Sequence, residues 1–192
     1  MSTVLVISVL ASQLAMMAIR APHGQRSRRV PVAENRRGRL ETFLLVLAGV
    51  TFFMPLLSLF TPLFDFAAQP FGIERLAAGG LVTLAGLWLL HRSHADLGTN
   101  WSVTLELREG HELVTRGIYG RVRHPMYLAF LVYGAGQALL VPNWVTGPAY
   151  LVAFALLVAL RLGPEEQMML NRFGPAYAGY MARTGRLLPK LQ

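Results

Sequence analysis

Cysteine is absent from this chain of 192 residues, which excludes a disulfide framework, a thiolate metal site and a cysteine nucleophile. Charge is scarce as well, because Asp, Glu, Lys and Arg together make up 15% of the residues, against about 25% in soluble domains. No glycine-rich loop of the G-x-G-x-x-G or P-loop type occurs, so a nucleotide would not be held in a Rossmann unit. Hydrophobic residues instead make up 54% of the chain, a composition typical of an integral membrane protein.

Five apolar segments predict an all-α, polytopic fold with about five transmembrane helices, at residues 3–19, 40–63, 73–90, 126–141 and 144–160. The first segment lacks the basic start and the small-residue cleavage site of a signal peptide, so we interpret it as a retained helix. The second and third approach or exceed the roughly 20 residues needed to cross a bilayer. The last two are shorter and are joined only by Pro142 and Asn143, which predicts a helical hairpin.

The arginines predict how these helices are oriented. The loop from Arg20 to Arg39 holds seven arginines and one acid, Glu34, whereas the connection over residues 61–72 has no Lys or Arg. The positive-inside rule therefore places the N-terminus outside and the basic loop in the cytoplasm. With five crossings, the polar stretches 91–123 and 161–192 fall on that cytoplasmic side. The net charge of +8 fits a basic rim against anionic lipid headgroups, and we expect no nucleic-acid partner because no nucleic-acid-reading module is recognisable.

Two polar blocks beside the apolar segments are the candidates for chemistry. The first, His111–Tyr127, reads HELVTRGIYGRVRHPMY, and the second, Arg161–Pro189, reads RLGPEEQMMLNRFGPAYAGYMARTGRLLP. Ahead of the first block, Trp101–Leu107 alternates in part between apolar and polar residues, which predicts a short extended segment before a turn at Glu109-Gly110. Histidines occur here without a carboxylate cluster, so we expect no metal site.

These two blocks resemble the signatures of the isoprenylcysteine carboxyl methyltransferase family, whose members are membrane-integral enzymes that use S-adenosylmethionine. The resemblance runs from about Leu97 to Pro189. It implies a cytoplasmic pocket for S-adenosylmethionine, formed by the loop before the fourth helix and the C-terminal helical tail. It also implies a three-span membrane anchor, residues 1–92 with the basic loop 20–39, followed by a catalytic half, residues 93–192. That half comprises a cytoplasmic connector (93–124), a helical hairpin (125–161) and a helical tail (162–192).

The resemblance further implies the roles of individual residues. Arg161 corresponds to the arginine that binds the substrate carboxylate, and Glu165 to a glutamate that touches the cofactor, so both are candidate catalytic residues. Thr104 stands where the family often has a polar cofactor contact. The remaining expected contacts with S-adenosylmethionine are His111, Glu112, Leu113, Val114, Tyr119, His124, Pro125, Met126 and Tyr127.

The favoured acceptor is the carboxylate of an isoprenylated cysteine or a similar lipophilic molecule that arrives through the membrane lipids. A carboxyl group with a pKa near about 4 is already ionised at neutral pH, so methyl transfer to it needs no general base. Arg161 suits this acceptor because a guanidinium stays charged and can grip a carboxylate through two parallel hydrogen bonds. Two alternatives stay open: a phospholipid amine methyltransferase of the same superfamily, and a non-catalytic lipid-binding membrane protein.

Local features allow simpler interpretations of the same residues. His124-Pro125 could serve only to start the fourth helix, with Arg121 and Arg123 at the level of the lipid headgroups. Glu166, like its neighbour Glu165, could be no more than a favourable anion at a helix N-terminus. Gly163-Pro164 predicts that the fifth span ends near Arg161 and that a new helix starts at Pro164. Arg161 and Glu165 would then not pair as residues one helical turn apart.

Overall fold

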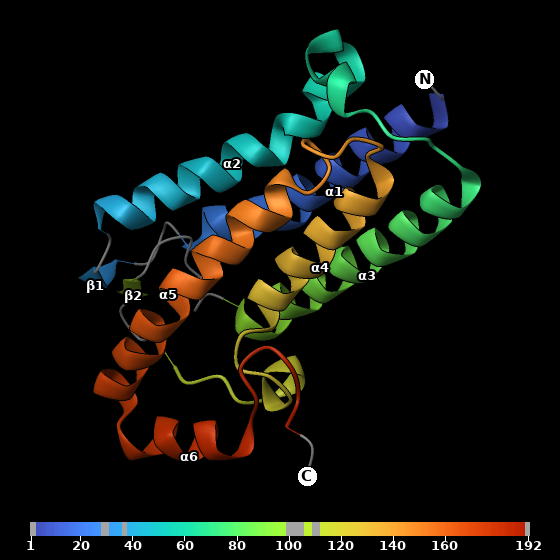
Figure 1. The fold of residues 1–192 in the computed structure, drawn as a ribbon. Helices are drawn as coiled ribbons and strands as arrows, with labels where there is room; N and C mark the ends of the chain where they lie inside the picture. The colour runs from blue at the N-terminus through green and yellow to red at the C-terminus, as the bar shows by residue number, and fades with distance from the viewer. Residues whose placement is uncertain (1–2, 28–30, 36–37, 99–105, 109–111, 191–192) are drawn as a thin grey trace.

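Long helices dominate the fold of the computed structural model, which describes residues 3–27, 31–35, 38–98, 106–108 and 112–190. Five of them lie side by side, and a short sixth helix lies across one end of the bundle (Figure 1). The long helices are α1 (Thr3–Ser27), α2 (Arg39–Phe60), α3 (Ile73–Leu97), α4 (Pro125–Leu140) and α5 (Ala149–Phe173), and the sixth is α6 (Pro175–Arg183). α4 packs between α3 and α5, while α2 packs against α5.

Two short strands also occur in the described residues, β1 (Val32–Asn35) and β2 (Glu106–Arg108), and they pair antiparallel. The predicted extended segment Trp101–Leu107 overlaps β2 at its end, and its earlier residues lie outside the described part of the chain. The described fold is therefore helical apart from this one strand pair.

Three helices of the described chain are long and apolar enough to cross a membrane: Thr3–Arg26, Arg39–Phe60 and Ile73–Leu97. They correspond to the first three predicted spans. α4, with 16 residues, is a shorter apolar helix, and the second half of α5 carries charged residues. The outward face of α2 leaves large apolar side chains uncovered, including Phe43 and Phe60 at 61% and 62% exposure. Such a continuous apolar face is suited to lipid rather than to water.

The hairpin between α4 and α5 turns through a longer connection than the predicted Pro142-Asn143. α5 begins at Ala149, because Asn143 organises a polar turn after α4. Its side-chain oxygen accepts hydrogen bonds from the amides of Val145 and Thr146, each at 2.9 Å, and its side-chain nitrogen donates to the carbonyl of Phe64 at 2.7 Å. Phe64 belongs to the 3-10 helix η1 (Pro62–Ala67) after α2, so this turn joins the two hairpins at the same end of the bundle.

Helices α3 and α4 approach so closely that glycine is required at their contact. A β-carbon at Gly79 would lie 2.7 Å from the amide nitrogen of Leu140, and one at Gly136 would lie 2.3 Å from the hydroxyl of Thr83. Small residues of this kind allow helix backbones in membranes to pack by direct contact. This contact fixes the position of α4 relative to α3.

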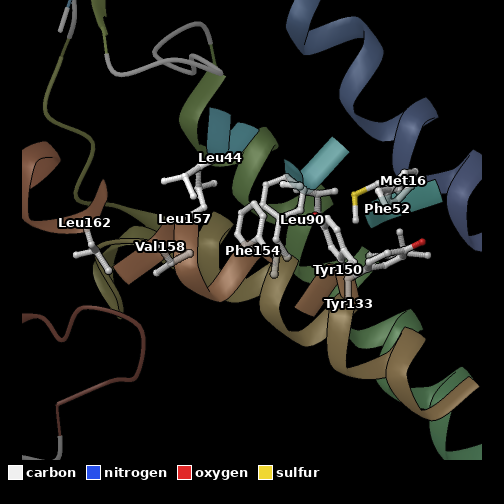
Figure 2. Packing of buried hydrophobic residues seen from close by; sticks show 14 residues of the cluster. Met16, Leu44, Phe52, Leu90, Tyr133, Tyr150, Phe154, Leu157, Val158 and Leu162 are labelled. Carbon is white, nitrogen blue, oxygen red and sulfur yellow. The ribbon is translucent and has the colours of Figure 1, made fainter. Parts of the chain in front are cut away.

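The buried core is shared by all five long helices (Figure 2). Met16 of α1, Phe52 of α2, Leu90 of α3, Tyr133 of α4 and Leu157 of α5 belong to one apolar cluster. The cluster extends along α5 to Leu162, one residue beyond Arg161. The polar end of α5 is therefore held by the same packing that holds the bundle together.

Candidate active site

The C-terminal tail returns to the loop that precedes α4. The amide of Arg123 donates to the carbonyl of Gly185 at 2.8 Å, and the amide of His124 donates to the carbonyl of Arg186 at 3.0 Å. The hydroxyl of Tyr180 on α6 donates to the carbonyl of Tyr119 at 2.6 Å. Two polar blocks that are separated in the sequence by the α4–α5 hairpin thus form one unit.

Glu166 lies at the centre of this unit, and its side chain is 3% exposed. One carboxylate oxygen accepts from Nη2 of Arg123 at 2.8 Å, and the other accepts from Nη2 of Arg186 at 2.7 Å. Burial alone would raise the pKa of Glu166, but hydrogen bonds from His124, Arg186 and Arg123 outweigh burial and lower this pKa to about 2. Glu166 is thus an ionised link between α5, the loop before α4 and the tail.

His124 stands between two acids. Its Nε2 is 3.3 Å from a carboxylate oxygen of Glu166, and its Nδ1 is 3.7 Å from one of Glu165. Burial would lower the pKa of His124, but the hydrogen bonds and negative charges of Glu165 and Glu166 raise it above its ordinary value. The ring stacks on that of Tyr127, with centroids 5.6 Å apart. Pro125 is at the first position of α4, as in the simpler interpretation, but the side chain of His124 makes no capping hydrogen bond.

Arg161 belongs to the same cluster. Its Nε is 3.4 Å from Glu165, its Nη1 is 3.2 Å from Glu41 of α2, and its guanidinium lies over the ring of Tyr127 at 5.9 Å. The hydroxyl of Tyr127 donates to Glu165. The side chains of His124 and Arg161 therefore converge on a single carboxylate, that of Glu165.

The predicted break of the fifth span at Gly163-Pro164 is wrong. α5 runs without interruption from Ala149 to Phe173, and Arg161 and Glu165 do pair one turn apart. Pro164 lies on an exposed face of α5. Because proline has no N–H group, the carbonyl of Leu160, one turn earlier, loses its hydrogen-bond donor, and Leu160 is 45% exposed. A β-carbon at Gly163 would meet nothing within 4 Å, so there is space around this turn for the helix to adjust to the proline ring.

A pocket of about 370 Å³ lies between the end of α3 and the segment before α4. Its walls include Glu112, Leu113 and Val114 of the first block, together with Asp96 of α3. Its volume falls in the range of small-molecule sites, roughly 300–1,000 Å³. His124, Arg161 and Glu165 are not among the residues that line it.

Asp96 also fixes the loop that follows this pocket. It accepts a hydrogen bond of 2.8 Å from the amide of Ile118, in the 3-10 helix η3 (Gly117–Gly120). Gly117 has a φ of +60°, and a β-carbon there would lie 2.2 Å from the Asp96 carboxylate. Glycine is therefore required on two grounds, its left-handed backbone and the close approach of an acid.

The structure divides the expected cofactor residues into three groups. Glu112, Leu113 and Val114 line the pocket, whereas His124, Tyr127 and Glu165 belong to the charged cluster. Tyr119 and Pro125 are buried, and Met126 lies against the apolar core. Thr104 and His111 lie outside the described residues.

Three further residues of the cluster were not singled out as site residues from the sequence. Arg123 was weighed as a headgroup-level residue, yet its side chain is 6% exposed and is hydrogen bonded to Glu166. Glu41 and Arg186 complete the cluster from α2 and from the tail. The alternation of arginines around His124 in RVRHP was the available signal for Arg123, whereas no local pattern pointed to Glu41.

Comparisons with known proteins find similarity to one enzyme family. A model of the isoprenylcysteine carboxyl methyltransferase family matches residues 80–171. The protein-S-isoprenylcysteine O-methyltransferase of Tribolium castaneum is 32% identical over 116 residues, which are 59% of this chain and 41% of that protein. Protein-S-isoprenylcysteine O-methyltransferase A of Arabidopsis thaliana is 30% identical over 110 residues, which are 57% of this chain and 53% of that protein. The chain thus spans about half the length of these relatives.

The solved structure of a eukaryotic intramembrane Ras methyltransferase, an isoprenylcysteine carboxyl methyltransferase, has a similar fold. It superposes with a TM-score of 0.55 and 26% identity, over 82% of this chain and 54% of that one. Fold and cluster together define a helical membrane protein with a charged site at one end of its bundle. The family model, the curated relatives and the solved structure all belong to the isoprenylcysteine carboxyl methyltransferases, the family that the sequence resembles.

Proposed function

We propose that this protein is an S-adenosylmethionine-dependent methyltransferase that methylates the carboxylate of a lipophilic acceptor, such as an isoprenylated cysteine. The observation that carries the proposal is the convergence of His124 and Arg161, from the two polar blocks, on the carboxylate of Glu165 at 3.7 and 3.4 Å. The names of the relatives support the same acceptor class. In this proposal residues 93–192 form the catalytic half, and residues 1–92 form its membrane anchor.

The residues present fit an adenosyl amino acid. The lining of the pocket is mainly polar: Asp96 and Glu112 offer polar atoms for a ribose or an ammonium group, and Leu113 and Val114 add a smaller apolar surface for a base. When bound, S-adenosylmethionine supplies a methyl group on a positively charged sulfur. We assign its binding to Glu112, Leu113 and Val114 with His124, Tyr127 and Glu165, and we retain Thr104 and His111 as proposed contacts.

The role proposed for Arg161 is to bind and orient the acceptor carboxylate. Its guanidinium is fixed by Glu165 and by the ring of Tyr127, so its orientation is set before an acceptor arrives. The Arg161 side chain is 9% exposed, and hydrogen bonds between charged groups are stronger in such a site than in water. Because a carboxylate is already ionised, no residue needs to remove a proton from the acceptor.

The position of Glu41 next to the basic loop supports an active site on the cytoplasmic side of the membrane. Glu41, which contacts Arg161, lies in the first turn of α2, directly after the basic loop 20–39. The positive-inside rule assigns that loop to the cytoplasm, so the cofactor would arrive from there and the acceptor from the surrounding lipid. The N-terminus would then lie outside.

The test is transfer of a labelled methyl group by the purified protein in lipid nanodiscs, with N-acetyl-S-farnesylcysteine or phosphatidylethanolamine as acceptor. We expect methylation of the farnesylcysteine, at a rate that does not rise between pH 6.5 and 8 through ionisation of the acceptor. Methylation of the amine lipid instead, with a rate that rises with pH, would replace the proposed acceptor. Failure to bind S-adenosylhomocysteine by calorimetry would indicate a non-catalytic lipid-binding protein.

Arg161→Ala should separate acceptor binding from cofactor binding. Loss of a buried charge pair costs about 3 kcal/mol, which corresponds to about a hundredfold decrease in kcat/KM for the carboxylate acceptor. The affinity for S-adenosylhomocysteine should change little. Arg161→Lys should also be impaired, because an ammonium group lacks the two-pronged geometry of the guanidinium. Normal turnover in Arg161→Ala would show that the carboxylate binds elsewhere.

A further inference from the structure

An apolar surface covers the end of the bundle opposite α6, where η1 meets the turn between α4 and α5 (Figure 1). We call residues 62–67 and 141–148 the end cap. Phe66 of η1 is 80% exposed, and Trp144 of the turn is 72% exposed. Leu63 of η1 is exposed as well. Large apolar side chains that gather on one surface indicate a partner other than water.

The two parts of the end cap are held to each other by their backbones. The amide of Trp144 donates to the carbonyl of Ala67 at 2.9 Å. The amide of Gln69, just after η1, donates to the carbonyl of Pro142 at 2.8 Å. The end cap is therefore one structure and not two independent loops.

The turn of the end cap has its backbone donors satisfied within the protein over the whole described stretch 141–148. Amides that donate to backbone carbonyls are those of Val141, Asn143, Trp144 and Gly147, and the amides of Val145 and Thr146 donate to the side chain of Asn143. The other two residues are prolines and have no amide N–H. Half of the stretch is buried, including Asn143 and Thr146. Irregular backbone is tolerated at membrane depth only when it is satisfied and packed in this way.

Charge is absent from the chain on both sides of this turn. No Asp, Glu, Lys or Arg occurs from Pro125 to Leu160, which includes α4, the turn and the first half of α5. Two charged residues lie near the rim of the end cap: Asp65 in η1, and Arg75 of α3, whose Nε donates to the carbonyl of Leu139 at 3.2 Å. Because charged groups are costly in hydrocarbon, these two place the end cap close to the lipid headgroups.

Helix lengths place the end cap below the membrane surface. α4 has 16 residues, which span about 24 Å, whereas the hydrocarbon core is about 30 Å thick. Gly79 of α3 packs against Leu140 at the end of α4. The first residues of α3, Ile73–Ala78, therefore project beyond α4 by about 9 Å. When α3 crosses the bilayer, α4 and its turn end short of the surface.

We infer that the end cap is a lipid-inserted surface: Leu63, Phe66 and Trp144 enter the membrane leaflet opposite the candidate active site, at the boundary between headgroups and hydrocarbon. The partner is the glycerol and upper acyl-chain region of the lipids. Tryptophan is favoured at this depth because its ring is apolar while its indole N–H can donate to a lipid carbonyl. The short hairpin is accommodated in this way without exposing its apolar turn to water.

The absence of cysteine allows a direct test, because each variant then carries a single thiol. Phe66→Cys and Trp144→Cys are compared with the control Glu74→Cys in lipid nanodiscs, by their rates of reaction with a water-soluble maleimide. Glu74 is exposed and lies on the part of α3 that projects beyond α4. The thiolate is the reactive form and is disfavoured in apolar surroundings, so both end-cap variants should react about a hundredfold more slowly than the control. All three should react at similar rates after unfolding in SDS.

Slow labelling would report lipid and not burial in the protein, because Phe66 and Trp144 are largely exposed in the fold. Reaction of either end-cap variant within about threefold of Glu74→Cys overturns the inference. Where Trp144→Cys does not fold, Leu63→Cys takes its place.

A nitroxide attached to the same thiols provides a second measurement. At positions 66 and 144 it should collide more often with O₂, which concentrates in lipid, than with a water-soluble nickel complex, and the reverse should hold at position 74. More frequent collisions with the nickel complex at positions 66 and 144 would show that the end cap faces water.

Discussion

Glu166→Gln should release the C-terminal tail from the loop before α4. In the wild type, Arg123 donates from Nε and Nη2 to one carboxylate oxygen, both at 2.8 Å, and Arg186 donates to the other oxygen at 2.8 and 2.7 Å. Glutamine keeps the size of the side chain, but it removes the charge and turns an amide donor toward one of the guanidinium groups.

The free-energy cost of Glu166→Gln follows from how deeply each arginine partner of Glu166 is buried. Arg123 and Glu166 are 6% and 3% exposed, so loss of their pairing costs about 3–5 kcal/mol. Arg186 is 57% exposed, and its pair adds little because water screens it. The lower figure, about 3 kcal/mol, corresponds to roughly a hundredfold increase in the population of the open tail.

Hydrogen exchange measured by mass spectrometry on peptides from residues 175–190 tests this prediction. Amides such as that of Thr184, which donates to Tyr180, should exchange roughly a hundredfold faster in Glu166→Gln. Peptides from α3 should be unaffected. Gln167→Ala is the control, because Gln167 is exposed on the same helix and bonds only locally, to Asn171. Tail exchange within threefold of the wild type would refute the view that Glu166 holds the tail in place.

Three further predictions concern the loop and the tail. Tyr180→Phe removes a buried hydrogen bond of 2.6 Å to a carbonyl and should lower the melting temperature by about 3–6 °C in a thermal unfolding assay. Gly117→Ala should lower it by more than Gly163→Ala, because the first places a methyl group 2.2 Å from Asp96 at positive φ and the second meets open space; equal effects would contradict this. Since folding raises the pKa of His124, its stabilisation is complete below about pH 6.5 and is lost as the pH rises through the raised value. The melting temperature should fall over that interval, and this pH dependence should be smaller in His124→Gln.

The helical part of the fold could largely be predicted from hydropathy. α1, α2 and α3 begin within one residue of the predicted segments, and α1 and α3 extend beyond their predicted ends. Both helices are longer than predicted because helical hydrogen bonding continues through polar residues, such as those at the end of α3. Hydropathy detects only the apolar part of such a helix. The prediction of a break at Pro164 was wrong because an exposed proline costs the helix one hydrogen bond, and the packing of α5 outweighs this cost.

The charged cluster could be predicted only in part. Residues within the two blocks, such as His124 and Glu165, were identified because their motifs are local in the sequence. The pairing of Arg161 with Glu41 joins residues 120 positions apart on helices whose contact no periodicity reveals. Arg123 was weighed as a surface residue for the same reason, since its burial depends on the tail, which follows it by about sixty residues.

The docking of residues 185–186 onto Arg123 and His124 has a consequence for biosynthesis. A ribosome releases the chain from its N-terminal end, so α1 to α4 emerge, and can be inserted, before the segment that pairs with these two amides has been made. Until then Arg123 lacks the acid on α5 and the carbonyls of the tail, and it must remain hydrated at the membrane surface. Closure of this end of the bundle is therefore a late event in the maturation of the protein, after the apolar helices have packed.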